Sequence, residues 1–223
     1  MPSYPRLITN VETQEPFVAL TFDDGPHPIY TPRVLQVLAK YQAKATFFMV
    51  GEAAQRYPEI VRMVAEAGHA IGNHSWDHPY LPLVQSRFCR LRQLWACAKA
   101  TAPYGQRLFR PPFGAHNAQV LFDARLLRYK VILWNVSAQD WVSQKSEEIT
   151  RKMITRLKPG NIFLLHDTIC DSKLPETDFD RVPMIQGLDE ALLILKSQIQ
   201  FVTIPTLLQA GKAVSNWPIP KQP

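Results

Sequence analysis

The chain has 223 residues, 46% of them hydrophobic, and a formal net charge of +6 at pH 7. This length suits one α/β domain with its own core, and three cysteines are too few for a disulfide-rich scaffold. The positive residues are scattered, which argues against nucleic acid as a partner, and no apolar run reaches the roughly 18–20 residues that a membrane-spanning helix needs.

The N-terminal residues lack the apolar stretch of a secretory signal. Two interpretations of the location stay open, a cytoplasmic protein or a secreted protein without its leader. We expect one domain over residues 1–223, with a core at about 17–205 between irregular, proline-rich arms. The sequence leaves the oligomeric state open, and a monomer is favoured.

Short apolar runs alternate with helical patterns along the chain. The first run, 17–22, predicts a buried strand, and Thr31 followed by Pro32 predicts the N-cap and first residue of a helix. Pro58 and Gly68 predict the start and end of the next helix. The further expected strands are 45–50, 70–73, 108–110, 131–136, 162–165 and 201–204. The further expected helices are 84–101, 116–128, 146–157 and 187–198, with a long loop at 167–186.

This alternation predicts parallel strands with helices outside them. Two architectures satisfy it, a barrel with its active site at the C-terminal ends of the strands and a doubly wound open sheet. The open sheet usually has a glycine-rich turn after its first strand, and the segment Asp23-Asp24-Gly25-Pro26 is not such a turn. We therefore expect the barrel.

Polar residues that are unusual in a core follow the ends of successive expected strands. They are Asp23 and Asp24 after the first strand, His74 and His78 after the third, Arg110 after the fourth, Asp140 after the fifth and His166 after the sixth. In a barrel all of these residues face one mouth. Each alone is weak evidence, but together they predict an active site at that mouth.

The spacing of two histidines predicts a divalent metal site. His74 and His78 are four residues apart, which places them on one side of a helical turn. With one aspartate they form a set of two histidines and a carboxylate that leaves positions open for water and substrate. The turn at Gly25 lets both Asp23 and Asp24 enter the site, and two carboxylates so close need a cation or a proton nearby.

Two further strand ends predict groups for acyl chemistry. The rigid segment from Arg110 to Gly114 is suited to hold a backbone N–H as an oxyanion donor, and a buried Arg110 would need an aspartate as its partner. His166 emerges from an apolar strand as a candidate general acid. Both Asp140 and Asp167 are candidates for the carboxylate that orients it.

Several other residues are expected to have structural roles. His69 and His116 are expected to be structural or at the surface, whereas His27 is expected to line the mouth. The densest basic run, 87–92, is typical of a solvated helix face. The three cysteines are expected as mostly buried thiols without a disulfide.

Five segments, in this order, resemble the motifs of the polysaccharide deacetylases with the NodB homology domain, carbohydrate esterase family 4. The segments are TFDDGP (21–26), HSWDH (74–78), RPPFG (110–114), SAQDW (137–141) and LLH (164–166). The resemblance implies a deformed (β/α) barrel of about seven parallel strands. It also implies a divalent metal, usually Zn²⁺, with Co²⁺, Ni²⁺ or Mn²⁺ as alternatives, and an extracytoplasmic location, which is usual in the family.

The resemblance implies a role for each residue that matches a family motif. Asp24, His74 and His78 would bind the metal. Asp23 would be the general base held by Arg110, and His166 would be the general acid tuned by Asp140. The Phe113 backbone N–H would stabilise the oxyanion, and Trp141 and Leu164 would form the pocket for the acetyl methyl. Ser137 stands where relatives often have Asp, and we expect this change to affect only local structure.

The expected function is that of a metal-dependent hydrolase that removes acetyl groups from N-acetylated carbohydrate, such as peptidoglycan or chitin-like oligosaccharide. The alternatives are an acetylxylan O-deacetylase, a non-sugar amidohydrolase on the same fold and a catalytically inactive carbohydrate-binding module. The last two predict loss of a metal ligand, of Asp23 or of His166, and all of these residues are present. Residues 79–86 and 167–186 are expected to select the polymer.

Overall fold

A curled parallel sheet surrounded by helices forms the body of the computed structural model, which describes residues 7–142, 145–170 and 180–215. The strands of this sheet are β2 (Phe17–Asp23), β3 (Ala45–Met49), β4 (Ala70–Asn73), β5 (Gly105–Phe109), β6 (Lys130–Val131), β7 (Val136–Ser137), β8 (Ile162–His166) and β9 (Gln200–Phe201). Their order is β6-β5-β4-β3-β2-β8-β7, and β9 pairs with β2. All of the paired neighbours are parallel. The predicted deformed barrel is therefore confirmed.

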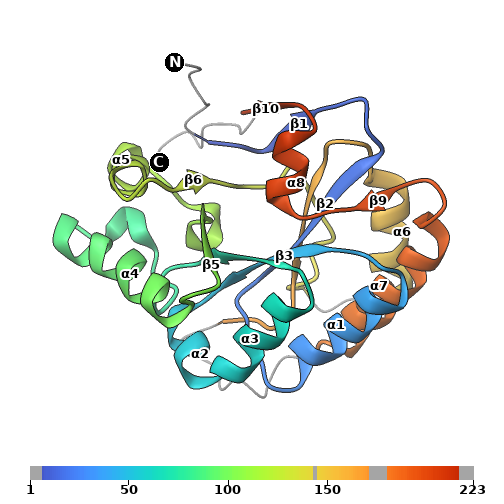
Figure 1. Ribbon diagram of the computed structural model, residues 1–223, viewed down its shortest axis with the longest axis horizontal. Coiled ribbons are helices and arrows are strands. Elements are labelled where there is room, and N and C mark those ends of the chain that lie inside the picture. The colour runs from blue at the N-terminus through green and yellow to red at the C-terminus, as the bar shows by residue number, and fades with distance from the viewer. Residues whose placement is uncertain (1–6, 143–144, 171–179, 216–223) are drawn as a thin grey trace.

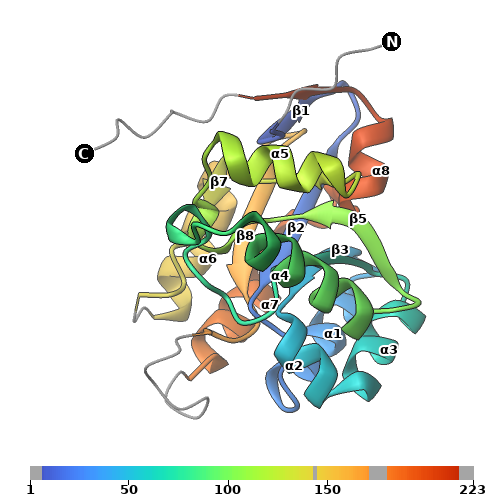
Figure 2. The same ribbon diagram turned by 90° about the vertical axis from the view of Figure 1, so that its left-hand side faces the viewer.

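Most of the helices lie on the outer side of this sheet, whereas α8 (Ile204–Gln209) lies at the end where the strands begin (Figure 1). The helices are α1 (Tyr30–Lys40), α2 (Gly51–Arg56), α3 (Pro58–Glu66), α4 (Arg87–Ala100), α5 (Ala118–Leu126), α6 (Ser146–Arg156), α7 (Val182–Leu195) and α8. Figure 2 shows α4 and α5 together on one side, where Leu94 and Val120 pack against Phe109 of β5. In the ranges that the structure describes, no helix combines the length and hydropathy that crossing a membrane requires.

Strand alternation divides the side chains of β2 between two cores. Phe22 and Leu20 belong to the large cluster beneath the helices, whereas Ala19 belongs to a smaller cluster inside the barrel. Ile204 and Leu207 of α8 join that inner cluster and close the end where the strands begin. Because successive strand residues face opposite ways, Thr21 and Asp23 face the barrel interior, and only the C-terminal end is left for a site.

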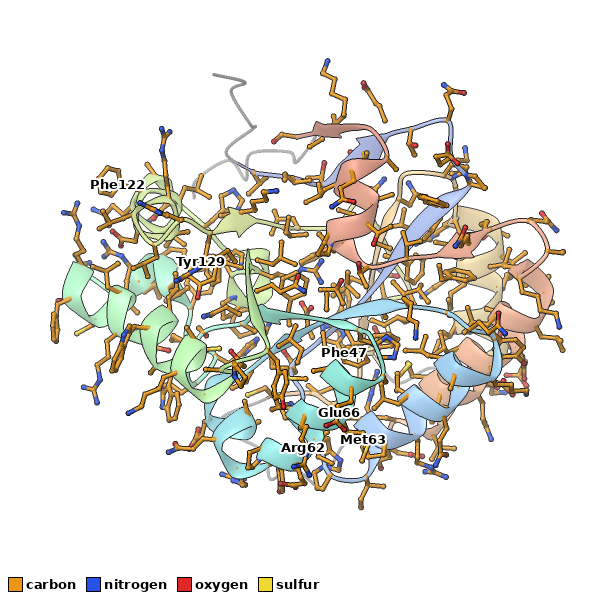
Figure 3. The ribbon with its side chains drawn as sticks, in the orientation of Figure 1. Phe47, Arg62, Met63, Glu66, Phe122 and Tyr129 are labelled. Atoms are coloured by element: carbon orange, nitrogen blue, oxygen red, sulfur yellow. The ribbon has the colours of Figure 1, made fainter. Side chains whose placement is uncertain are left out.

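The helices bury one face and expose the other, as α3 illustrates. Val61 and Val64 are buried, whereas the Met63 side chain on the opposite face is 42% exposed. Figure 3 shows Phe47 of β3 lying beneath this helix, with Arg62, Met63 and Glu66 along its outer side. The apolar residues recur at helical spacing, so the face toward the sheet follows from the sequence.

The start of α1 differs from the prediction. The helix begins at Tyr30, so Thr31 lies inside it and is not the N-cap. The imidazole Nδ1 of His27 accepts the N–H groups of Ile29 and Tyr30 at 3.1 and 3.2 Å and so takes the capping role. The Thr31 hydroxyl instead accepts the His27 N–H and donates to the Asp167 carboxylate.

The expected strand at 131–136 is also wrong as a continuous element. It is split into β6, which pairs with β5, and β7, which pairs with β8, at opposite edges of the sheet. The residues between them cross the gap in the barrel, and the carbonyl oxygens of Ile132 and Leu133 accept hydrogen bonds from Arg110 at 3.1 and 2.9 Å. A buried arginine therefore holds this crossing segment, together with a parallel bridge between Ile8 and Ile132.

Other element boundaries were misplaced where local patterns were ambiguous. The helix expected at 187–198 begins at Val182, and the short helix α2 was not expected. The strand expected at 201–204 ends at Phe201, because Thr203 caps α8. The arms are not wholly irregular, since β1 (Asn10–Glu12) pairs antiparallel with β10 (Lys212–Val214). Of the loop expected at 167–186, residues 171–179 lie outside the described residues.

Arg90 was expected on a solvated helix face but is buried in α4. It donates to Asp123 of α5 at 2.6 Å and to the carbonyls of Val84 and Gln85 at 2.7 and 2.9 Å, so the arginine joins α4 to its neighbours. The run of arginines hides this position because α4 places Arg87 outward and Arg90 inward. None of the three cysteines forms a disulfide, but the expectation of mostly buried thiols is wrong, since Cys97 is buried, Cys170 is half-buried and Cys89 is exposed.

Gly160 provides a test of how the barrel joins β1. Its φ is +82°, its carbonyl accepts the Val11 N–H at 2.9 Å, and an added Cβ would clash with the Val11 carbonyl oxygen. We expect Gly160→Ala to lower the free energy of unfolding by about 1–3 kcal/mol more than Gly68→Ala, because the first change adds an overpacking cost to the shared cost of positive φ. Gly68 has a φ of +77° but faces only the flexible Lys44 side chain. Denaturant titration measures both changes, and equal losses would contradict this account.

Candidate active site

Two adjacent carboxylates begin the site at the end of β2. Asp23 is the last strand residue, and Asp24 has a φ of 76°, in the left-handed region. This turn aims both side chains at His74, whose Nε2 lies 3.8 Å from Asp23 Oδ2 and 3.3 Å from Asp24 Oδ1. The prediction that the turn at Gly25 brings both carboxylates into one place is confirmed.

His74 and His78 follow β4 on an irregular loop and not on the expected helical turn. Ser75 and His78 both have positive φ, 68° and 56°, so the loop bends back on itself. The result is the same convergence, since Nε2 of each histidine lies 3.3 Å from Asp24 Oδ1. Donor atoms of Asp24, His74 and His78 all lie within 4.8 Å of one another.

A hydrogen bond of His74 bears on whether the cluster of Asp24, His74 and His78 can bind a metal ion. Its Nδ1 lies 2.7 Å from the carbonyl oxygen of Arg110, and because a carbonyl only accepts, the proton is on Nδ1. Nε2 therefore lies on the side of the Asp24 carboxylate, 3.3 Å from Oδ1, where a cation or a proton between the two atoms would stabilise the pair. A ligating histidine held through its other nitrogen is the usual arrangement at metal sites. These residues thus fit a divalent metal.

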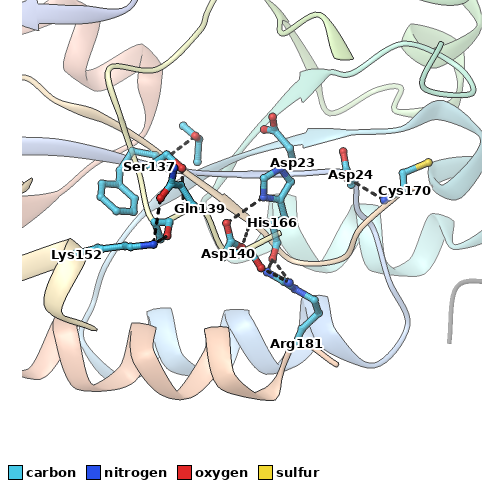
Figure 4. A network of polar contacts seen from close by, with 12 residues as sticks. Asp23, Asp24, Ser137, Gln139, Asp140, Lys152, His166, Cys170 and Arg181 are labelled. Atoms are coloured by element: carbon cyan, nitrogen blue, oxygen red, sulfur yellow. Dashed lines mark hydrogen bonds and ion pairs between the residues drawn. The ribbon is translucent and has the colours of Figure 1, made fainter. Parts of the chain in front are cut away.

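The main chain also fixes the second oxygen of Asp24. Asp24 Oδ2 accepts the Cys170 N–H at 2.9 Å, which turns Oδ1 toward the histidines (Figure 4). Burial alone would raise the pKa of Asp24, but hydrogen bonds with His74 and His78 outweigh it and hold the pKa well below its usual value. This carboxyl is therefore an anion, as a metal ligand must be.

Arg110 lies directly after β5 and is fully buried. Its NH1 donates to Asp23 Oδ1 and to the Thr21 hydroxyl, each at 2.7 Å, and its remaining donors bind the two carbonyls in the barrel gap. Burial lowers the pKa of Arg110, and the contact with Asp23 opposes that effect. A guanidinium this buried needs such a partner, and the expected aspartate is the one found.

Phe113 lies in the turn that follows Arg110. The segment passes through Pro111 and Pro112, and Phe113 has a φ of 60° and a ψ of 9°. Its ring centroid is 4.5 Å from that of His78. The rigid turn therefore brings the Phe113 ring against His78, at the edge of the histidine and aspartate cluster.

His166 ends β8, and its Cα is the register partner of Asp23 on the adjacent parallel strand. Its Nδ1 lies 3.1 Å from Asp140 Oδ1, and its backbone N–H donates to Asp140 Oδ2 at 2.9 Å. Asp140 is thus the carboxylate that orients His166. Asp167 turns away to Thr31, which decides between the two candidates.

Electrostatics keep His166 protonated. Burial would lower the pKa of His166, but the contact with Asp140 and the charges of Asp24 and Asp23 outweigh it and raise the pKa to about 9. Burial likewise opposes ionisation of Asp140, yet His166 and Arg181 lower the pKa of that carboxyl. The two side chains form an imidazolium and carboxylate pair beside the cluster.

Trp141 and Leu164 are placed differently relative to His166. The Trp141 ring stands edge-on to the imidazole with centroids 5.4 Å apart, and the residue is 42% exposed. Leu164 is buried two residues before His166 on β8, and so shares the inward face of that strand. Of the two predicted pocket residues, Trp141 therefore contacts the imidazole, whereas Leu164 precedes it on the strand.

Two residues of the site were missed from the sequence: the Thr21 hydroxyl accepts a hydrogen bond from Arg110, and Arg181 binds both Asp140 and the His166 carbonyl. Asp167, expected as a possible partner of His166, instead contacts the turn that carries Asp24. Burial raises the pKa of Asp167 to about 7. A threonine inside an apolar strand and an arginine in a polar stretch have no local signal that separates them from ordinary structural residues. His27, expected to line the mouth, caps α1 instead.

Backbone strain is concentrated around these groups. Within the described residues, seven non-glycine residues have positive φ, and most belong to the loops of the site. Those in the site loops are Asp24, Ser75, His78, Phe113 and Gln139. Such conformations cost energy and persist where the surrounding structure enforces them, typically at functional sites.

Comparison with known proteins identifies the family. The family model described as polysaccharide deacetylase matches residues 10–132. The peptidoglycan-N-acetylglucosamine deacetylase PgdA of Listeria monocytogenes is 36% identical over 95% of this chain, which spans 43% of that protein's length. A chitooligosaccharide deacetylase of Azorhizobium caulinodans is 37% identical over 67% of this chain and 73% of its own.

A solved structure extends the similarity to nearly the whole chain. A peptidoglycan N-acetylglucosamine deacetylase in complex with an N-hydroxybenzamide derivative superimposes with a TM-score of 0.83 and 30% identity. The match covers 94% of this chain and 95% of that one. The chain therefore belongs to the polysaccharide deacetylase family, a family of carbohydrate-active hydrolases, as the five motifs predicted.

Proposed function

We propose that this protein is a metal-dependent deacetylase that hydrolyses the N-acetyl groups of glucosamine-containing polymers. One observation carries the proposal: beside the Asp24, His74 and His78 cluster stand both a carboxylate held by arginine and an imidazole held by a carboxylate. Those flanking groups, Asp23 and His166, are on adjacent strands at paired positions. Hydrolysis of an amide needs both a base for water and an acid for the leaving nitrogen.

Asp24, His74 and His78 would hold the metal, most often zinc in sites of this composition. When bound, such a metal lowers the pKa of water and polarises the acetyl carbonyl. The three donors leave coordination positions open, which suits a catalytic site and not a closed structural one.

Asp23 would accept the proton of the attacking water. Arg110 donates to Oδ1 of Asp23, whereas Oδ2 is on the side of His74. The buried guanidinium fixes the carboxylate and compensates its charge, so the base is held in one orientation. The Phe113 backbone N–H would donate to the developing oxyanion, the role of a preorganised donor in acyl transfer.

His166 would protonate the nitrogen that leaves. The C–N bond of the acetamide breaks as the proton moves from the imidazolium to nitrogen, and acetate and a free amine result. Asp140 keeps the proton donor charged until that step. Leu164 and Trp141 would contact the acetyl methyl.

The pH dependence of turnover should report His166. Because its raised pKa keeps it protonated at neutral pH, we expect kcat to be retained there and to fall as the pH rises through the pKa. A cation bound beside it lowers this value, so the fall is expected no higher than about pH 9. His166→Ala should lower kcat by about 10²–10⁴-fold and remove this limb. A pH–rate profile of both proteins measures this, and an unchanged limb in the variant would exclude His166 as the acid.

The relatives favour N-acetylglucosamine polymers as substrate. The compared proteins are described as acting on peptidoglycan N-acetylglucosamine or on chitooligosaccharide. The test is acetate release from chitooligosaccharides, peptidoglycan and acetylxylan under identical conditions. We expect release from one or both N-acetylated substrates. Release from acetylxylan alone would instead establish the O-deacetylase alternative.

A further inference from the structure

Arg181 is a buried arginine beside the proposed acid. It directly precedes α7, its exposed fraction is 4%, and Figure 4 shows its guanidinium reaching back to Asp140 and His166. NH2 donates to Asp140 Oδ2 and, at 3.0 Å, to the His166 carbonyl. NH1 donates to the Asp140 carbonyl at 2.8 Å, and Nε donates to the His166 carbonyl at 3.2 Å.

These contacts leave Asp140 little freedom to rotate. Its Oδ1 is bonded to His166 Nδ1, while its Oδ2 accepts from Arg181 and from the His166 backbone N–H. Each carboxylate oxygen is therefore committed to a different direction. Because the imidazole is oriented by Oδ1, anything that fixes Oδ2 also fixes the ring.

Burying a guanidinium costs several kcal/mol unless it is paired. The planar guanidinium of arginine can donate to two residues at once in a fixed geometry, which the single ammonium group of lysine does not do. Among the described residues, the Arg181 side chain donates hydrogen bonds only to Asp140 and His166. An arginine serving only to anchor α7 to the barrel would not need both members of the proposed acid pair.

We propose that Arg181 is a positioning residue for the acid step, holding Asp140 and the end of β8 so that His166 delivers its proton to the leaving nitrogen. This inference rests on the proposed function, in which water attacks the acyl carbon and the C–N bond breaks. Arg181 touches no reacting atom and acts through Asp140. Its positive charge also competes with the imidazolium for the same carboxylate, which makes His166 a better proton donor.

A change of leaving group separates this role from a structural one. An N-acetyl sugar releases an amine that requires a proton, whereas 4-nitrophenyl acetate releases a phenolate that does not. For Arg181→Met we expect kcat on N-acetylchitooligosaccharide to fall about 10–100-fold, part of what a general acid contributes, with KM little changed. Hydrolysis of the aryl ester should be nearly unaffected, and Arg181→Lys should recover part of the loss.

Arg90 offers a matched control, since it is equally buried and its hydrogen bonds go to Asp123 and to the Val84 and Gln85 carbonyls, not to the acid pair. Arg90→Met should reduce stability, and any effect on the oligosaccharide should fall on KM, through residues 84 and 85, and not on kcat. The double variant His166→Ala with Arg181→Met should be no slower than His166→Ala alone, because residues that act through one another are non-additive. Equal loss on both substrates, or additive losses, would overturn the proposal.

A measurement without catalysis keeps this test independent of the proposed function. NMR of the metal-free protein reports the proton on His166 Nδ1 that bonds Asp140. We expect this resonance to shift and exchange faster in Arg181→Met but not in Arg90→Met. If the native protein released no acetate, the proposed function would fail, and this comparison would still decide the positioning role. An identical resonance in native and Arg181→Met proteins would contradict it.

Discussion

Asp23→Asn is expected to reduce acetate release about 10²–10⁴-fold, the range that a general base contributes. The amide keeps the shape of the side chain but cannot accept a proton from water. Asp24, His74 and His78 are untouched, so metal content should be retained. Acetate release and elemental analysis of the same preparation measure the two effects separately.

Asp123 supplies the matched control for this change. It is also a buried aspartate bonded to a buried arginine, at 2.6 Å from Arg90, but it lies on α5. Asp123→Asn should lower the free energy of unfolding, because it weakens a buried ion pair, and should leave kcat intact. Full activity in Asp23→Asn, or equal losses in both variants, would remove Asp23 from the role of base.

His74→Ala is expected to abolish metal binding and, with it, turnover. The change removes one of three donors, which should weaken affinity by more than the roughly 10–100-fold that follows loss of a residue merely orienting a ligand. Metal content after dialysis, measured by elemental analysis, tests this. Retention of metal at the native level would refute the ligand assignment.

His69 distinguishes loss of a ligand from loss of a buried imidazole. It is buried between β3 and α3, and its Nδ1 accepts the Ala45 N–H at 3.1 Å. Burial lowers the pKa of His69 to about 4, so the ring is neutral and structural. His69→Ala should lower stability while retaining the metal and most of the activity.

The position of the site could be predicted because the end of each strand is marked in the sequence by a polar residue at the end of an apolar run. Each of Asp23, Arg110 and His166 directly follows or ends an apolar run, and parallel strands bring such ends to one edge. The inward direction of Asp23 follows from alternation along β2. The five motifs then identified the family, which strand patterns alone do not reveal.

The parts that could not be predicted depend on contacts between distant segments. The convergence of His74 and His78 comes from positive φ in an irregular loop, although the spacing is also that of a helical turn. The segment between β6 and β7 is held by Arg110, which binds carbonyls more than twenty residues away. The local spacing predicted that the histidines converge, but it contains no information on the loop that brings them together or on the split strand.

Arg181 shows the same limit at the level of function. It lies in a polar stretch expected as a loop, and its partners Asp140 and His166 are 41 and 15 residues distant. A charged residue in such a stretch is usually exposed. Its burial against the proposed acid became apparent only from the fold.

Dependence of amide hydrolysis on a bound metal is the most direct test of the central claim. Acetate release from N-acetylchitooligosaccharide would be measured for the native protein, after treatment with a chelator, and after Zn²⁺ or Co²⁺ is restored. We predict that release falls to the background rate without metal and recovers in proportion to metal bound, up to one ion per chain. Undiminished release by protein shown to be metal-free would contradict the proposed mechanism.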